Sequence, residues 1–164
     1  MNAPRPAGAG RPPRGSRKVA KPHFLESGVA RAVAAAPSLL LAFDFGTKRV
    51  GVASGNSLTA TATPLTTLAQ VGNDARFGAI AALIAEWQPD TLVVGVPRHP
   101  DGAAHDNTHR AQRFARQLHG RFALPVVEVD ERYTTTQALA EGAADVDAAS
   151  AALILEQYFN ELPR

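Results

Sequence analysis

The segment from Leu39 to Ser54, LLLAFDFGTKRVGVAS, constrains the fold more than any other part of this 164-residue chain. An apolar run ends in one acid, Asp44, and is followed by a glycine-containing turn, the basic pair Lys48 and Arg49, and a second apolar run. This pattern predicts a buried strand, a tight hairpin and a returning strand. Charged side chains are almost never fully buried without a partner. Asp44 therefore indicates a metal ion, a phosphate or a structural hydrogen bond at the end of the first strand.

Apolar runs and helical repeats continue to the end of the chain. Strands are expected at Leu39–Phe45, Arg49–Asn56, Ala60–Leu68, Thr91–Val96 and Pro125–Glu131. Helices are expected at Ala75–Trp87, Asn107–His119, Thr134–Glu141 and Asp147–Asn160. Three consecutive strands favour an antiparallel meander, whereas the later alternation of strands and helices favours parallel strands joined by crossovers. The sequence therefore predicts an α/β fold with a mixed five-stranded sheet and helices on both faces.

Residues 1–37 differ in composition from the remainder of the chain. They are rich in Pro, Gly and Arg and hold seven Lys or Arg against one Glu, whereas residues 38–164 hold ten basic and fourteen acidic residues. So few large apolar side chains cannot offset the entropy cost of ordering the chain. We therefore expect a largely disordered basic extension over 1–37, with a short helix at Phe24–Ala36 as its one candidate element, and a folded domain over 38–164. The extension could hold phosphates electrostatically or serve only as a solubilising segment, and its lack of a Ser-rich bias disfavours the third alternative, organelle targeting.

Composition excludes several classes of protein. The chain has no Cys, which rules out a disulfide scaffold and a thiolate metal site. No apolar stretch approaches the roughly 20 residues that span a bilayer, and the N-terminus lacks the apolar segment of a secretory signal. We therefore expect a cytoplasmic protein without a membrane partner.

Acidic residues gather at the ends of the predicted elements. Asp44 ends the first strand, Glu131 ends the fifth, and Asp145 and Asp147 lie at the start of the last helix. In α/β sheets, functional groups gather near the carboxyl ends of strands. Converging carboxylates bind Mg²⁺ or Mn²⁺, and such a site can activate water for attack on a phosphodiester. The alternatives are a helix cap for either of the last two acids and an ion pair of Glu131 with its neighbour Arg132.

Basic residues also fall at the ends of strands. Four of them are expected to border the same cleft and to contact substrate phosphates, namely Lys48, Arg49, Arg98 and Arg132. A further three recur along one predicted helix, where they either contact phosphates or form a solvated face, namely Arg110, Arg113 and Arg116. Aromatic residues make up only 6% of the chain, which argues against a base-stacking platform. Recognition of a nucleic acid should therefore rely on its backbone and shape.

Four motifs occur in a fixed order across residues 38–160. They are DFGTKRVGVA at 44–53, VGVP at 94–97 followed by Asp101-Gly102, VDERYTT at 129–135 and VDAASAALIL at 146–155. Together they resemble the RuvX (YqgF) family, described both as Holliday junction resolvases and as nucleases for the 5′ end of precursor 16S ribosomal RNA. The resemblance implies a ribonuclease H-like fold and a divalent-metal nuclease, with Asp44, Glu131 and Asp147 as catalytic acids that hold Mg²⁺ or Mn²⁺.

The leading hypothesis is thus a metal-dependent endonuclease that processes precursor 16S ribosomal RNA. A nuclease for branched DNA is the first alternative, and a non-catalytic RNA-binding assembly factor is the second. The segment before Asp147, QALAEGAADV, is shorter than is usual in the family and has no basic residue, which favours the assembly factor slightly. The strand ending in DFGT also resembles the first phosphate loop of the actin and sugar-kinase group, but the chain has no room for the second domain of that group.

Overall fold

The computed structural model describes residues 38–162, except 70–71, 100, 133–141 and 143. The predicted helices at Phe24–Ala36 and Thr134–Glu141 lie outside the described residues. The elements follow in the order β2 (Leu39–Phe45), β3 (Val50–Asn56), β4 (Thr61–Leu68), α3 (Asn73–Trp87), β5 (Thr91–Arg98), α4 (Asp106–Phe122), β6 (Val126–Arg132) and α6 (Val146–Glu161). Each lies within a few residues of a predicted element.

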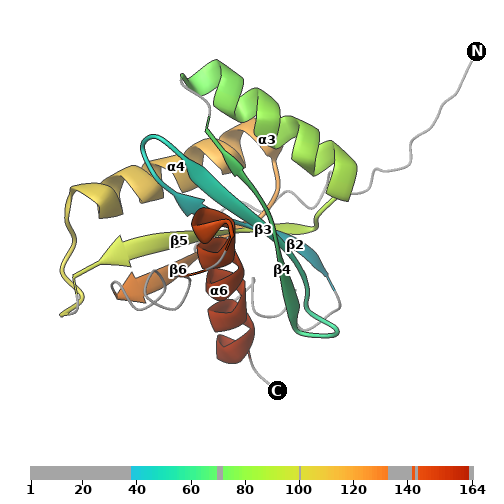
Figure 1. Ribbon diagram of the computed structural model, residues 1–164. Helices are drawn as coiled ribbons and strands as arrows, with labels where there is room; N and C mark the ends of the chain where they lie inside the picture. Colours follow the sequence, from blue (N-terminus) through green and yellow to red (C-terminus); the bar gives the residue numbers. More distant parts are fainter. Residues whose placement is uncertain (1–37, 70–71, 100, 133–141, 143, 163–164) are drawn as a thin grey trace, which may run out of the picture.

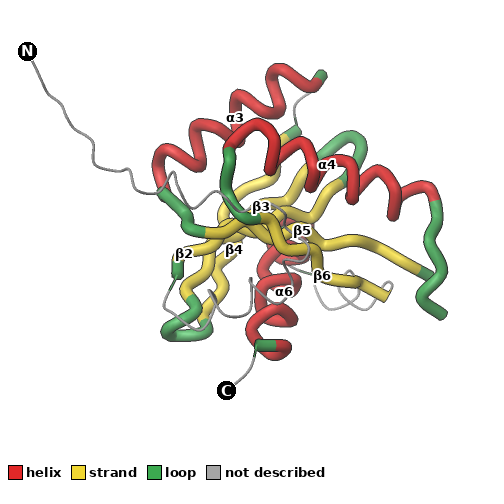
Figure 2. Tube along the Cα trace, turned by 180° about the vertical axis from the view of Figure 1, so that it is seen from behind, coloured by secondary structure: helices red, strands yellow, loops and turns green. Residues whose placement is uncertain are grey.

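The five strands form one mixed sheet in the order β4-β3-β2-β5-β6. Strands β2, β3 and β4 pair antiparallel, whereas β5 lies parallel to both β2 and β6. Figures 1 and 2 show α3 and α4 on one face of this sheet and α6 on the other. This architecture confirms the predicted ribonuclease H-like class: an antiparallel meander continued by parallel strands, with helices on both faces.

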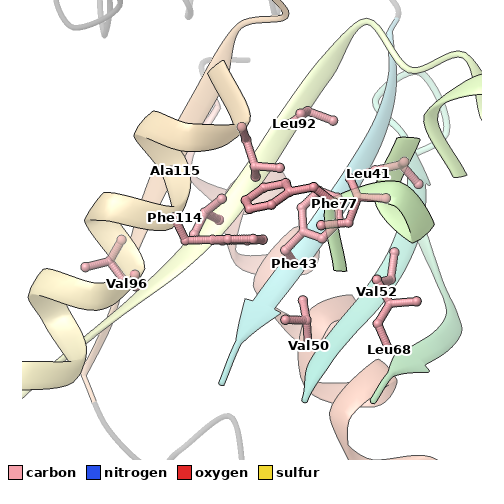
Figure 3. Packing of buried hydrophobic residues seen from close by; sticks show 14 residues of the cluster. Leu41, Phe43, Val50, Val52, Leu68, Phe77, Leu92, Val96, Phe114 and Ala115 are labelled. Carbon is pink, nitrogen blue, oxygen red and sulfur yellow. The ribbon is translucent and has the colours of Figure 1, made fainter. Parts of the chain in front are cut away.

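Alternation along the central strands builds a separate core on each face of the sheet. In β2, Leu41 and Phe43 are fully buried under α3 and α4, whereas Leu40 and Ala42 are buried under α6. Phe114 of α4 lies edge-on to Phe43 with ring centroids 5.9 Å apart (Figure 3). Because β2 is covered on both faces, it reads as an unbroken apolar run. Asp44 interrupts that run two residues after Ala42, and a period of two places it on the α6 face.

Candidate active site

Two glycines flank Asp44 in the sheet and leave space beside it. Asp44 pairs with Gly51 on β3 and with Gly95 on β5. A Cβ on Gly51 would overlap the backbone carbonyl of Asp147, and a Cβ on Gly95 would overlap the buried Oε2 atom of Glu131. Because Gly51 and Gly95 lack side chains, the first turn of α6 can lie on one side of Asp44 and the Glu131 carboxylate on the other. The structure therefore brings the three predicted acids to one region.

The pKa of Asp44 is shifted by its surroundings. Burial raises its pKa, and the negative charge of Asp147 raises it further, to about 7. A carboxyl group with this pKa is about half protonated at neutral pH. A cation placed between the two carboxylates would relieve both the repulsion and the desolvation, as bound metal ions do in other carboxylate sites. The electrostatics therefore favour a positively charged ligand beside Asp44.

The N-terminus of α6 assigns different roles to its two acids. The side chain of Asp145 is the N-cap and accepts a hydrogen bond from the backbone N–H of Ala148 at 3.0 Å. It also accepts a hydrogen bond from the hydroxyl of Thr67 on β4. Asp147 lies in the first turn and takes no part in this cap. The sequence pattern allowed either Asp145 or Asp147 to cap the helix. The structure shows that Asp145 is the cap, so the Asp147 carboxylate is not needed for capping.

Arg49, at the end of the β2–β3 hairpin, reaches across to α6. Its Nε atom donates to Oδ2 of Asp147 at 2.8 Å, with the Arg49 side chain 61% exposed and the Asp147 side chain 32% exposed. Lys48 precedes it in the turn and is exposed. Both predicted basic residues of the hairpin therefore lie beside the acids, and Arg49 already neutralises one of them.

A second arginine, which no pattern in the sequence indicates, holds this hairpin. Arg76 of α3 is buried, with 7% of its surface exposed, and its Nη2 atom donates to the carbonyl of Thr47 at 2.8 Å. Its guanidinium also lies over the ring of Phe45, 5.5 Å from the centroid. In an amphipathic helix pattern, an arginine ordinarily predicts a position on the solvent-exposed face. Only the tertiary packing shows that this one fixes the turn between Asp44 and Arg49.

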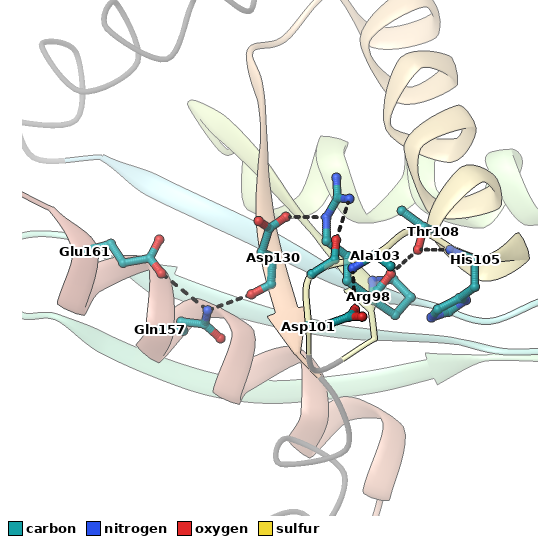
Figure 4. Close-up of polar contacts among 10 residues, drawn as sticks. Arg98, Asp101, Ala103, His105, Thr108, Asp130, Gln157 and Glu161 are labelled. Atoms are coloured by element: carbon teal, nitrogen blue, oxygen red, sulfur yellow. Dashed lines mark hydrogen bonds and ion pairs between the residues drawn. The ribbon is translucent and has the colours of Figure 1, made fainter.

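The other two predicted basic residues end the parallel strands β5 and β6. Arg98 ends β5 and points to the α4 face, where it pairs with Asp130 of β6 at 3.0 Å and donates to the carbonyl of Gly102 (Figure 4). It is thus separated from Asp44 by the sheet. Arg132 is the last residue of β6 and directly follows Glu131. The expected single cleft with all four basic residues at its edge therefore does not form around Asp44.

A divalent cation fits the donor chemistry of the site. Carboxylate oxygens are the preferred ligands of Mg²⁺ and Mn²⁺, and here they come from β2, β6 and α6. Within the described ranges, no three acidic or histidine side chains yet stand together as a ligand set. Asp147 instead faces Arg49. Asp44, Glu131 and Asp147 would hold the cation, and Arg49 would then share Asp147 with it or release Asp147.

Comparison with known proteins gives consistent results. The family model described as "RuvX: Holliday junction resolvase" matches residues 38–161. A protein of Polaromonas sp. (strain JS666) named "Putative pre-16S rRNA nuclease" is 67% identical over 123 residues, which cover 75% of this chain and 88% of that protein. A protein of the same name from Albidiferax ferrireducens is 63% identical over 130 residues, covering 79% of this chain and 83% of that protein.

Among solved structures, RuvC of Thermus thermophilus aligns with a TM-score of 0.46 at 12% identity, over 74% of this chain and 95% of that one. The same protein in complex with a Holliday junction substrate aligns with a TM-score of 0.43 at 16% identity, over 74% of this chain and 92% of that one.

Proposed function

Because the chain belongs to the RuvX family, we propose that it is an endonuclease that cleaves precursor 16S ribosomal RNA near its 5′ end and uses Mg²⁺ or Mn²⁺. The observation that carries this proposal is the convergence of Asp44, Glu131 and Asp147 beside Gly51 and Gly95. Relatives with more than 60% identity carry the corresponding name. Processing of ribosomal RNA would place the protein in the cytoplasm.

The three acids would hold the cation, and the hairpin would hold the substrate. A divalent cation in such a site neutralises developing charge and activates water for in-line attack on a phosphodiester. Arg49, once released from Asp147, and Lys48 lie where they can pair with the phosphate next to the scissile bond. Arg98 and Arg132, at the ends of β5 and β6, would contact the nucleic acid farther along its backbone.

The experiment is cleavage by the pure protein of precursor 16S RNA and, separately, of a four-way DNA junction, each with Mn²⁺ or with EDTA. We expect metal-dependent cleavage of the RNA. The junction is included because the family description names a Holliday junction resolvase. Cleavage of the junction alone would replace RNA by branched DNA as the substrate. Metal-independent RNA binding without any cleavage would favour the assembly factor.

Asp44→Asn tests the assignment of the site. The variant should abolish cleavage and leave the thermal melting transition cooperative. Asp74→Asn is the matched control, because Asp74 is an exposed acid in the first turn of α3, on the opposite face of the sheet. Full activity of Asp44→Asn would reject the assignment of Asp44 as a metal ligand.

A further inference from the structure

The seven arginines whose side chains the structure describes divide into two groups. Four of them are engaged with named partners: Arg49 with Asp147, Arg98 with Asp130, Arg76 with the Thr47 carbonyl, and Arg121, whose guanidinium lies 4.1 Å from the centroid of the Phe77 ring. A second group lies on α4 and is exposed, namely Arg110, Arg113 and Arg116. Arg110 donates to Oδ1 of Asn107 at 3.4 Å, but no ion pair involves this group in the part of the chain that the structure describes.

The second group shares one side of α4. The residues that pack into the core from this helix are Ala111, Phe114, Ala115 and Leu118. Helical periodicity places Arg113, Arg116 and His109 on the opposite, solvent-facing side, with Arg110 at its border. At a rise of 1.5 Å per residue, Arg110 and Arg116 are separated by about 9 Å along the axis. We call the four residues His109, Arg110, Arg113 and Arg116 the α4 basic surface.

This concentration of charge departs from the remainder of the domain. Residues 38–164 carry ten basic and fourteen acidic residues, yet α4 holds four of those arginines and only one acid, Asp106. Asp106 lies one turn before Arg110 on the same side of the helix, and further acids lie on β6. Arg116 and Arg98 lower the pKa of Glu128, which burial nevertheless raises, and Asp130 pairs with Arg98. The β6 acids thus balance the Arg116 end of the surface, whereas at the other end Asp106 offsets one of the two charges of Arg110 and Arg113 and leaves a net positive charge.

The position of α4 relates this surface to the proposed active site. α4 follows the carboxyl end of β5 and runs back along the sheet on the face opposite α6 (Figures 1 and 2). Asp44 also lies near the carboxyl end of its strand, parallel to β5. The N-terminal part of α4, with Arg110 and Arg113, therefore lies at the same edge of the sheet as the acids but on its other face. A polyanion that crosses this edge contacts both.

We propose that the α4 basic surface binds the phosphate backbone of an RNA duplex that flanks the cleavage site. The proposal rests on the proposed function and extends it from the reacting phosphodiester to a second contact. The solvent-facing side of α4 carries three arginines, His109 and Asp106 but no Phe, Tyr or Trp, so it offers charge for phosphates rather than a stacking platform. Double-stranded RNA is recognised mainly through its shape, phosphates and 2′-hydroxyls.

The test measures binding of the full chain to a 24-base-pair RNA duplex by fluorescence anisotropy in EDTA, as a function of KCl concentration. Each lost phosphate contact should reduce the slope of log Kd against log salt by about one. The triple variant Arg110→Gln/Arg113→Gln/Arg116→Gln should therefore reduce the slope by about two to three and weaken binding at 50 mM salt by about tenfold or more.

Arg113→Gln and Arg121→Gln form a matched pair, since each removes one charge from the same helix. Arg113→Gln should reduce the slope by about one, whereas Arg121→Gln, whose guanidinium is engaged with Phe77, should leave it nearly unchanged. Equal effects of the two variants would overturn the proposal, because they would show a response to net charge alone. An unchanged slope in the triple variant would also overturn it and would leave the surface to an acidic protein partner.

The measurement separates this proposal from the proposed function, because binding in EDTA requires no cleavage. If the protein cleaves neither substrate but the triple variant loses duplex binding, the proposed nuclease activity is refuted and the RNA-binding role of the α4 basic surface stands. If the protein cleaves precursor RNA, and the triple variant has an unchanged KM and an unchanged salt slope, the proposed nuclease activity stands and the RNA-binding role of the α4 basic surface is refuted.

Discussion

At the scale of single residues, the site depends on what is missing around Asp44. Its neighbours in the sheet are Gly51 and Gly95, and the space above them is occupied by the backbone at Asp147 and the carboxylate of Glu131. An acid in this setting pays a desolvation cost that the apolar strand does not offset. The pKa of Asp44 near 7 records that cost, and it yields a prediction about stability.

The unfolding free energy should fall as the pH rises through the range set by Asp44. The unfolded chain releases this proton near its ordinary pKa of 3.8, whereas the folded chain retains it until about pH 7. Between these values the folded state binds more protons, so raising the pH destabilises it, by about 4 kcal/mol at most. Asp44→Asn removes the effect. Its gain in stability over the wild type should grow from pH 5 to pH 8.

Urea denaturation in EDTA at pH 5, 6, 7 and 8 measures this difference. Asp74→Asn serves as control, and its difference from the wild type should stay constant across the same range, because Asp74 is exposed. A stability gain of Asp44→Asn that does not change between pH 5 and pH 8 would show that Asp44 has an ordinary pKa in the fold.

Gly95→Ala should impair catalysis more than stability. The new methyl group would overlap Oε2 of Glu131 and the Cδ1 atom of Ile154, so both side chains must move. Overpacking of this kind costs about 1–3 kcal/mol, and displacement of the Glu131 carboxylate should remove most of the cleavage activity. The assays are urea denaturation and metal-dependent cleavage of precursor RNA.

Gly78→Ala is the control for this substitution. Gly78 lies within α3, and nothing lies within 4 Å of the position that its Cβ would take. The change should therefore stabilise the protein by about 0.5–1 kcal/mol and preserve activity. Wild-type cleavage by Gly95→Ala would contradict the placement of Glu131 beside Asp44.

The residues of the site differ in how far the sequence predicts them. Asp44 is evident because it ends an apolar run, and the structure gathers Glu131 and Asp147 near it as expected. The pair of Arg49 with Asp147 joins positions 98 residues apart, so no local pattern indicates it. Arg98 lies beyond the predicted end of its strand at Val96, and only the continuation of β5 to Arg98 places its side chain on the same face as Val94 and Val96.

At the scale of elements, the start of α6 separates a structural acid from a candidate catalytic one. Asp145 caps the helix and binds Thr67 of β4, whereas Asp147 pairs with Arg49 of the hairpin. Asp145→Ala should lower the unfolding free energy by about 1–2 kcal/mol through loss of the cap. Asp147→Asn should change it by less than about 1 kcal/mol, because exposed ion pairs contribute little. Cleavage should show the reverse order, with Asp147→Asn inactive.

Urea denaturation and cleavage of precursor RNA, measured on the same preparations, provide the comparison. Asp145→Ala should retain cleavage at a temperature where it is fully folded. Equal loss of stability in both variants would mean that the two acids share the cap, which the hydrogen bonds to the Asp145 side chain argue against.

The bounds of the elements show where sequence patterns lose resolution. Ala60, predicted as the first residue of a strand, has a φ of 53° and belongs to the turn, so β4 begins at Thr61. Strand β5 continues past Val96 to Arg98, because its parallel pairing with β6 continues through that residue. The type of each described element follows from apolar periodicity, whereas its end depends on partners distant in the sequence.

At the scale of the whole molecule, the excess of positive charge and the folded core lie in different segments of the chain. The described core and all five strands lie within residues 38–162, whereas seven Lys or Arg against one Glu lie within residues 1–37. The family model likewise begins at residue 38. We therefore treat the extension as an electrostatic module attached to an acidic domain, which remains a prediction from composition.

Deletion of residues 1–37 should leave the melting temperature unchanged within about 2 °C, since a segment so poor in large apolar side chains is not expected to add to the core. It should weaken binding to an RNA duplex and reduce the salt slope, because up to seven phosphate contacts are lost. A full-length variant with these seven basic residues changed to Gln should reproduce the effect, whereas reordering the same 37 residues should not. If the reordered chain binds as weakly as the deletion, then specific contacts rather than net charge explain the affinity. A slope unchanged by deletion would instead assign RNA binding to the folded domain, with the hairpin and the α4 basic surface as its cationic contacts.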